Sequence, residues 1–411
     1  MSTRPNSAIP PTRSLKILLL AHNVEGAGTY IRFKGLARHL ALLGHEATLI
    51  AASRTPSLMT RRLEVDGIRL HLTPGILGQR IRNAGLSPAD AMYRLLHVRA
   101  ERYDVVIASD HRPAASLPAL LARTLHGATY ISDWADLWGR GGIVGDRSFL
   151  GRALLSMPET SMERRIHRSA DGLTAASTDL LRRALALGIP QSRVMRLPNG
   201  VDVNLFRPVP NREAVRRGIG LNAGVKALIY AGTAPIDMDL IWDSFRLVYG
   251  RRQDAYLVIL GKHWRGLGRL GPAQANVLQL GYLPWDEYAA VLGAGDLMLL
   301  PYRNTPRNRG RFPGKLAFYM AVGRPTISNP TGDIKRLFEE HEVGRLAGER
   351  PEAFAETILE LLDHERLADQ LGQRAREIAE RDFAWPILAQ SLEAFIKRMR
   401  DPVTSDGSPA R

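Results

Sequence analysis

The sequence predicts an α/β protein made of two doubly wound, Rossmann-like domains that face each other across a cleft. Three observations carry this prediction. The 411 residues are more than one hydrophobic core usually fills, which favours two domains. Short apolar runs alternate with segments of helical periodicity along nearly the whole chain, as in parallel sheets covered on both faces. The alternation pauses once, between Pro198 and Pro210, and then resumes.

Strands and helices alternate in both halves. Lys16–Ala21 is a short apolar run, and Thr29–Leu43 follows with apolar residues at helical spacing before Gly44. In the rest of the first half we expect strands at 47–51, 105–108, 129–132 and 173–176, and helices at 91–102, 114–125, 152–168 and 178–187. In the second half we expect strands at 227–231, 256–260, 277–280, 297–300 and 326–328, and helices at 240–249, 316–321, 351–362, 366–380 and 387–399.

These elements define the expected domains. The N-terminal domain spans 15–197 and the C-terminal domain 198–383, and a last helix at 384–400 is expected to pack back on the N-terminal domain. Residues 1–14 are typical of a loose leader and 401–411 of a disordered polar tail. Ligands of open α/β sheets bind beyond the carboxyl ends of the strands, so we expect the chemistry in the loops that follow strands.

The composition limits the classes of function. The absence of Cys excludes disulfides, thiolate metal sites and a cysteine nucleophile. The 56 Lys and Arg outnumber the 41 Asp and Glu, and residues 1–190 hold 25 basic and 15 acidic residues. This net charge of +15 favours a polyanionic partner: phosphates, nucleic acid or an anionic membrane. The apolar run Ile17–Ala21 is too short for a signal peptide or a membrane span, so we expect a cytoplasmic protein, peripheral to the inner face of the membrane where it associates with one.

The strongest local signal is the basic segment Arg303–Lys315. Between Asp296 and Asp333 the chain has six basic residues and no acidic one. The segment follows a predicted strand and leads into a helix, where arginine forks and helix N–H groups can bind a diphosphate. The residues expected to do so are Arg307, Arg309, Arg311 and Lys315. A solvated basic loop is the alternative interpretation.

Other strand-to-helix loops offer weaker candidates. The glycines of Gly26-Ala27-Gly28 let backbone N–H groups approach an anion, although Ile31 stands where a dinucleotide fingerprint needs glycine. His111, Asp133 and Asp136 follow predicted strands and could accept a proton from a hydroxyl, or could instead be helix caps. Helix capping explains Asp237-Met238-Asp239 better than a cation site does, and no group has metal-ligand spacing.

Taken in order, the motifs resemble those of a known family. They are Gly28-Thr29-Tyr30, Arg168–Ser177, Leu197–Asp202, and Lys315 followed by Tyr319–Pro325. Their order and spacing resemble the two-domain GT-B glycosyltransferases, in particular glycosyltransferase family 4, over about residues 15–400. The resemblance implies that the first half binds a hydroxyl acceptor and the second half a nucleotide-sugar. It also implies transfer with retention of configuration, without a bound metal or any cofactor besides the nucleotide-sugar co-substrate.

The resemblance also implies site residues. Lys315 matches a phosphate-contacting lysine, and Tyr282 and Leu283 match a loop whose backbone meets the nucleobase. The full donor-binding set is Gly26, Ala27, Gly28, Asn199, Tyr282, Leu283, Arg307, Arg309, Arg311 and Lys315. Asp133 stands where many members carry a histidine that contacts the donor sugar. If transfer inverted configuration instead, Asp133 would be the base, with Asp136 and His111 as supports.

Alternatives remain at this point. The family's Glu-x7-Glu motif would fall on Gly310 and Phe318, which leaves a catalytically silent scaffold or partner protein as the second candidate function. Nucleic-acid binding rests on charge alone, because no base-stacking or recognition-helix motif accompanies it, and we expect no specific nucleic-acid partner. We expect a glycolipid, polysaccharide or small-molecule acceptor.

An anionic membrane is a further expected partner, through the predicted helix 91–102. Its apolar residues Met92, Leu95 and Leu96 lie together with basic residues close by, namely Arg94, Arg99 and Arg102. An ordinary amphipathic core helix explains the same pattern equally well.

Overall fold

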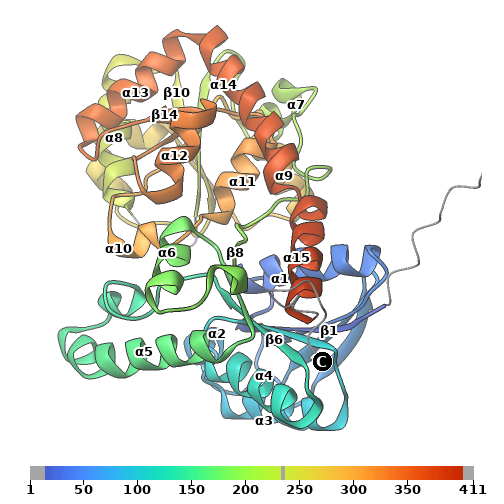
Figure 1. The fold of residues 1–411 in the computed structure, drawn as a ribbon. Coiled ribbons are helices and arrows are strands. Elements are labelled where there is room, and N and C mark those ends of the chain that lie inside the picture. The colour runs from blue at the N-terminus through green and yellow to red at the C-terminus, as the bar shows by residue number, and fades with distance from the viewer. Residues whose placement is uncertain (1–13, 233–236, 401–411) are drawn as a thin grey trace, which may run out of the picture. The chain divides into compact units, whose positions relative to one another are not determined.

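The computed structural model describes residues 14–232 and 237–400, and its contacts divide the chain into two units, Met1–Ile131 and Ser132–Arg411 (Figure 1). The predicted leader before residue 14 and the tail after residue 400 lie outside the described residues. The domain bounds expected from the sequence stay a prediction. No helix among the described residues is both long and apolar enough to cross a membrane.

The first unit has α/β architecture. In its sheet β1 pairs in parallel with both β2 and β5, and β2 pairs in parallel with β4. Its edge strand β3 is antiparallel to β4, across a turn at Asp66 and Gly67 that both have positive φ. This hairpin was not predicted. The elements are β1 (Lys16–Val24), α1 (Gly28–Leu42), β2 (Glu46–Ala52), β3 (Arg61–Val65), β4 (Ile68–Thr73), α2 (Gln79–Asn83), α3 (Pro88–Ala100), β5 (Val105–Ser109), α4 (Pro113–His126) and β6 (Thr129–Trp134), which crosses the boundary between the units.

The second unit contains a fully parallel six-stranded sheet in the order β11-β10-β9-β12-β13-β14, and a parallel pair formed by β7 and β8. Its strands are β7 (Gly172–Ala175), β8 (Val194–Arg196), β9 (Lys226–Gly232), β10 (Ala255–Gly261), β11 (Val277–Gly281), β12 (Leu297–Leu300), β13 (Thr326–Ser328) and β14 (Gly344–Leu346). Its α-helices are α5 (Phe149–Ser169), α6 (Thr178–Ala186), α7 (Arg212–Gly218), α8 (Met238–Arg251), α9 (Trp285–Ala294), α10 (Pro306–Arg309), α11 (Gly314–Ala321), α12 (Gly332–His341), α13 (Pro351–Asp363), α14 (Glu365–Ile378) and α15 (Trp385–Arg400). Short turns of other helix types are η1 (Ile143–Asp146), η2 (Gln191–Arg193), η3 (Leu267–Asn276) and η4 (Ala379–Phe383).

The six-stranded sheet is buried on both faces. Successive side chains of a strand point to opposite faces, so Leu228 packs in one core with α8 and α13 while Ile229 packs in another with α11. Helices α8 and α13 lie side by side in Figure 1. This confirms the doubly wound α/β class.

Because all six strands are parallel, their carboxyl ends share one edge of the sheet and their amino ends the other. At the end of the chain, Phe395 and Met399 of α15 lie against Gly172 of β7, so close that a Cβ there would be about 3 Å from each of them.

Candidate active site

Lys315 stands in the first turn of α11, at the carboxyl edge of the six-stranded sheet. In the described part of the chain no side chain caps this helix, and no acidic residue lies in its first turn, so its positive end is not neutralised locally. Residues four apart share a helix face, and both Lys315 and Tyr319 reach Ala231 in β9. Lys315 Nζ donates to the Ala231 carbonyl oxygen at 2.9 Å, and Tyr319 Oη accepts from the Ala231 N–H at 2.8 Å.

Among the residues that the structure describes, Lys315 has no ion-pair partner. Its Nζ lies 4.6 Å from the centroid of the Tyr230 ring. Within residues 14–232 and 237–400 Lys315 forms no ion pair, since its contacts are a carbonyl and an aromatic face. Burial lowers the pKa of Lys315 to about 8, and Asp237 offsets this only in part. A desolvated cation at the start of a helix is a site for an anion.

The three predicted arginines differ from Lys315 because each already has a partner. Arg311 Nε is ion-paired with Asp136 Oδ1, and Arg307 Nη1 lies 2.5 Å from Asp146 Oδ2. Arg309 donates to the side chain of Asn304. Burial lowers the pKa of Arg307, and the neighbouring Arg311 lowers it further. The structure therefore brings together Asp136 and Arg311, a proposed catalytic support and a proposed phosphate ligand.

The sequence predicted that Asp237 caps α8, and this prediction is wrong. Asp237 precedes the helix with positive φ, and its side chain makes no cap bond to the described residues. Both carboxylates of the pair bind Arg303 instead, whose Nη1 is 3.3 Å from Asp237 and whose Nη2 is 2.8 Å from Asp239. The reason is non-local, because a guanidinium from the loop after β12 forms charge-assisted hydrogen bonds with both acids.

Asp133 lies inside β6, not in the loop after the strand as predicted. Its side chain is buried and accepts a hydrogen bond from Thr174 Oγ1 at 2.6 Å. Asn199 donates from Nδ2 to the carbonyl of Phe312 at 2.7 Å, which holds the segment just before Lys315. The roles assigned to these residues stay predictions.

Packing explains both departures from the Glu-x7-Glu pattern. A Cβ on Gly310 would lie 2.8 Å from Leu137 Cβ, so no side chain fits there without a shift. Phe318 stacks on Phe206 with ring centroids 4.5 Å apart, and Trp285 meets it edge-on at 5.9 Å. Neighbouring atoms therefore leave no room for a side chain at position 310, and position 318 is part of an aromatic cluster.

The loop between β11 and α9 carries Tyr282 and Leu283. Tyr282 is 65 % exposed, and Gly281 before it has a φ of 71°. A Cβ on Gly281 would also lie 2.9 Å from His263 Nε2, so this turn requires glycine. The loop is therefore a fixed turn with an exposed tyrosine, whose ring offers a flat surface for a planar ligand.

In the first unit, the predicted glycine loop leads into α1. Gly26 has a φ of 80°, Ala27 is the N-cap without a side-chain bond, and a Cβ on Gly28 would meet nothing within 4 Å. Asn23, which sequence reasoning did not single out, accepts from both the N–H and the hydroxyl of Thr29. The helix start is therefore open to an approaching group at Gly28.

His111 is buried in the first unit, with Arg112 Nη1 3.5 Å from its Nε2. Close to it, His22 Nδ1 lies 3.6 Å from Asp110 Oδ2. Burial, and then Arg112, holds the pKa of His22 well below its usual range, so its imidazole is neutral. Sequence reasoning missed the His22–Asp110 pair, although the two residues lie on or directly after β1 and β5, which are neighbouring strands.

The membrane prediction for helix 91–102 is wrong for Arg94. This residue is fully buried and its Nε lies 2.6 Å from Asp90 Oδ1, because Asp90 one turn earlier is itself buried and needs a counterion. Met92 and Leu96 are exposed, one turn apart on α3.

With this geometry in view, the comparison with known families is decisive. Residues 25–200 match the family described as Glycosyl transferase 4-like domain, and residues 226–364 match Glycosyl transferases group 1. The chain belongs to the family 4-like GT-B glycosyltransferases. This confirms the resemblance read from the order of the motifs, and the protein is a glycosyltransferase.

Among curated proteins, this glycosyltransferase is 25% identical to a GDP-mannose-dependent alpha-mannosyltransferase of Mycobacterium tuberculosis, over 90% of this chain and 92% of that protein. It is 26% identical to a D-inositol 3-phosphate glycosyltransferase of Thermobispora bispora, over 54% of this chain and 55% of that protein.

Solved structures share the fold at low sequence identity. Sucrose-phosphate synthase from Thermosynechococcus elongatus superposes with a TM-score of 0.75 at 16% identity, covering 93% of this chain and 98% of that one. Anabaena Alr3699/HepE in complex with UDP-glucose gives a TM-score of 0.70 at 16% identity, covering 93% and 99%. These likenesses establish the GT-B fold of the glycosyltransferase.

Proposed function

We propose that this glycosyltransferase moves a hexose from a nucleoside-diphosphate sugar to a hydroxyl acceptor, with retention of configuration and without a metal. The observation that carries the proposal is Lys315, a desolvated cation without an ion-pair partner among the described residues, at the start of α11. A diphosphate supplies the missing counterion. The names of similar proteins support this donor class, since one is GDP-mannose-dependent and another was solved with UDP-glucose.

In this mechanism the chain's own positive charge replaces a metal ion. The bond between the anomeric carbon and the donor phosphate breaks, and negative charge grows on the departing diphosphate. Lys315 and the N-terminus of α11 stabilise that charge. The acceptor hydroxyl attacks the anomeric carbon from the face that the phosphate leaves, and its proton passes to a phosphate oxygen. No protein base is required for this reaction.

The remaining predicted residues then have positioning roles. Asp133 contacts the donor sugar and is held by Thr174 Oγ1. Asp136 fixes Arg311 beside the diphosphate through their ion pair. The exposed ring of Tyr282 lies beside the nucleobase.

A donor panel tests the proposal. The protein is mixed with GDP-mannose, UDP-glucose and ADP-glucose in the presence of EDTA, and donor hydrolysis and thermal stabilisation are measured. We expect one donor to stabilise the protein and to turn over without metal, with the product anomer matching the donor by NMR. An inverted anomer together with collapse of the rate in Asp133→Asn would make Asp133 a base. Stabilisation without any turnover on a panel of hydroxyl acceptors would favour the silent-scaffold alternative.

An anionic membrane surface is the second part of the proposal, and it places a lipid-linked acceptor within reach. The first half of α5 exposes large apolar side chains in a stretch with Arg147 and Arg152 and no acid between Asp146 and Glu159. These side chains are Phe149, Leu150, Leu154 and Met157. Exposed apolar residues flanked by cations are typical of helices that lie in a membrane interface.

Liposome flotation tests this surface. Wild-type protein should float with vesicles that contain anionic phospholipid at low salt and should be released at high salt, because the cationic contribution is screened. The double variant Phe149→Ser/Leu150→Ser should lose most of this binding. Leu205→Ser, at another partly exposed position of the second unit, is the matched control. Equal flotation of the double variant and the wild type would remove α5 from the surface.

A further inference from the structure

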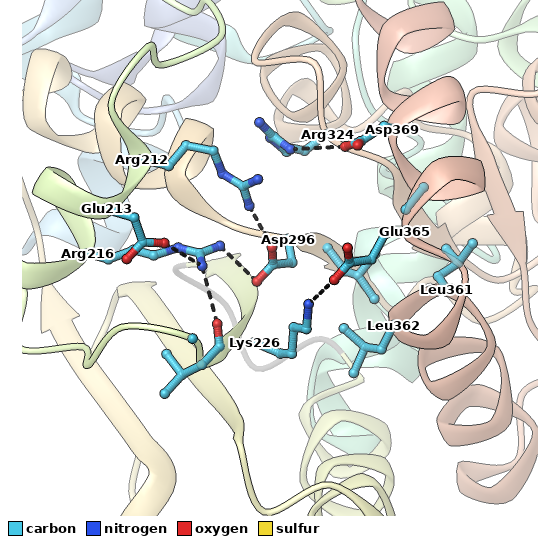
Figure 2. A pocket seen from close by; sticks show the side chains of 14 residues that line it. Arg212, Glu213, Arg216, Lys226, Asp296, Arg324, Leu361, Leu362, Glu365 and Asp369 are labelled. Carbon is cyan, nitrogen blue, oxygen red and sulfur yellow. Dashed lines mark hydrogen bonds and ion pairs between the residues drawn. The ribbon is translucent and has the colours of Figure 1, made fainter.

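A basic pocket lies in the second unit at the amino edge of the six-stranded sheet, the edge opposite Lys315. Its volume is about 270 Å³, and Figure 2 shows the charged side chains that line it. Lys226 begins β9, Asp296 directly precedes β12, and Arg324 lies two residues before β13. The eight-residue helix α11 separates the two sites, since Lys315 stands at its start and Arg324 follows its end.

The buried charge of this pocket is positive. The side chains of its four cations are each at most 27 % exposed, and they are Arg212, Arg216, Lys226 and Arg324. Of its acids only Asp296 is comparably buried, at 19 %. Glu213, Glu365 and Asp369 are 47–75 % exposed, so water screens them.

The ion pairs leave Arg324 as the least compensated cation. Asp296 forms ion pairs with two arginines, its oxygens lying 2.6 Å from Arg212 Nη2 and 2.8 Å from Arg216 Nη2. Lys226 is paired with Glu365. Within residues 14–232 and 237–400, the acid paired with Arg324 is Asp369, which lies 3.7 Å from Nη1, beyond hydrogen-bond length.

Unused hydrogen-bond donors point to a ligand. The Nε atoms of Arg212 and Arg324 are buried, and neither has a hydrogen-bond partner in the described part of the chain. Burial and the neighbouring Arg212 lower the pKa of Arg324 to about 10, as expected for a cation in a positive field. Buried donors of this kind are costly unless a partner satisfies them.

We propose that this pocket binds a phosphate-type oxyanion through Arg324 and Arg212, as a site separate from the donor site. Guanidinium groups are suited to this ligand because their forked N–H donors match phosphate oxygens. The anion is either free inorganic phosphate or the phosphate group of a small phosphomonoester.

The test is titration of inorganic phosphate, and in a parallel arm of glucose 6-phosphate, at constant ionic strength, followed by calorimetry and thermal unfolding. We expect saturable binding that stabilises the wild type. Arg324→Gln should weaken binding about tenfold or more, the size expected for losing a hydrogen bond between charged groups. Asp369→Asn should tighten it, because the competing carboxylate charge is gone. Tighter binding of glucose 6-phosphate than of phosphate identifies the monoester as the ligand.

Two further readouts make the outcome decisive. Lys315→Met should leave the phosphate response unchanged, which separates this pocket from the donor site. In phosphate-free buffer Arg324→Gln should be at least as stable as the wild type, because it removes a poorly paired buried cation. Loss of stability in Arg324→Gln together with no saturable phosphate response would overturn the proposal and make Arg324 a structural ion-pair residue. A response abolished by Lys315→Met would assign the phosphate to the donor site instead.

Discussion

Replacing Lys315 by methionine should stabilise the nucleotide-free protein while it weakens donor binding. Methionine keeps the length of the side chain and removes the charge. The pKa of Lys315 is about 8 in the folded protein against an ordinary 10.5, which corresponds to about 3 kcal/mol of cost to the folded state at pH 7. The lost hydrogen bond to Ala231 offsets part of this gain, so we expect a net stabilisation of about 1–2 kcal/mol.

The pH dependence identifies the cause of this stabilisation. Below pH 8 the folded wild type carries the full cost of the buried charge. Between pH 8 and 10.5 the unfolded chain still holds the proton that the folded protein has released, so wild-type stability rises with pH. The advantage of Lys315→Met should therefore shrink across this window.

The assay is the thermal unfolding midpoint of both proteins, without nucleotide, from pH 7 to pH 10. Lys335→Met is the matched control, because Lys335 is an exposed lysine of the same unit and its loss should change stability by less than about 0.5 kcal/mol. The reasoning is refuted if Lys315→Met is less stable than the wild type at pH 7 and the difference does not change with pH.

Three further predictions concern the same site. Donor affinity of the wild type should fall about tenfold per pH unit above pH 8, as Lys315 loses its proton, and Lys315→Arg should show no such fall in a calorimetric titration. Arg311→Ala should weaken nucleotide binding by about 1.5–3 kcal/mol. Asp136→Asn should weaken it by less, because this change leaves the arginine in place. Nucleotide affinity equal to that of the wild type in both variants would show that the pair is not part of the site. Phe318→Glu should destabilise the second unit by at least about 1 kcal/mol in thermal unfolding, because it breaks the stack on Phe206, and a stable variant with gained activity would contradict this.

The fold was readable from the sequence because its signals are local. The buried run 227–231 and the helical spacing of 240–249 depend on neighbouring residues, and both elements are present as β9 and α8. The hairpin of β3 and β4 was missed although Asp66-Gly67 is a turn signal, because β3 is an exposed edge strand with little apolar alternation.

The site was only partly readable because its partners come from distant segments. The sequence placed Lys315 at a helix start after a strand, but its lowered pKa comes from burial, which depends on how distant segments pack around it. The pairing of Arg303 with two acids more than 60 residues earlier has no local signature. The basic pocket likewise combines α7, the starts of β9 and β12, and α14.

In the proposed function Lys315 binds the diphosphate of a nucleotide-sugar donor. The most direct measurement is calorimetric titration of GDP-mannose, UDP-glucose and ADP-glucose into the wild type and Lys315→Met, with EDTA present. We expect that one donor binds the wild type and that its affinity drops by about 1.5–3 kcal/mol in Lys315→Met, although that variant is the more stable protein. A donor that binds both proteins equally well would contradict this expectation.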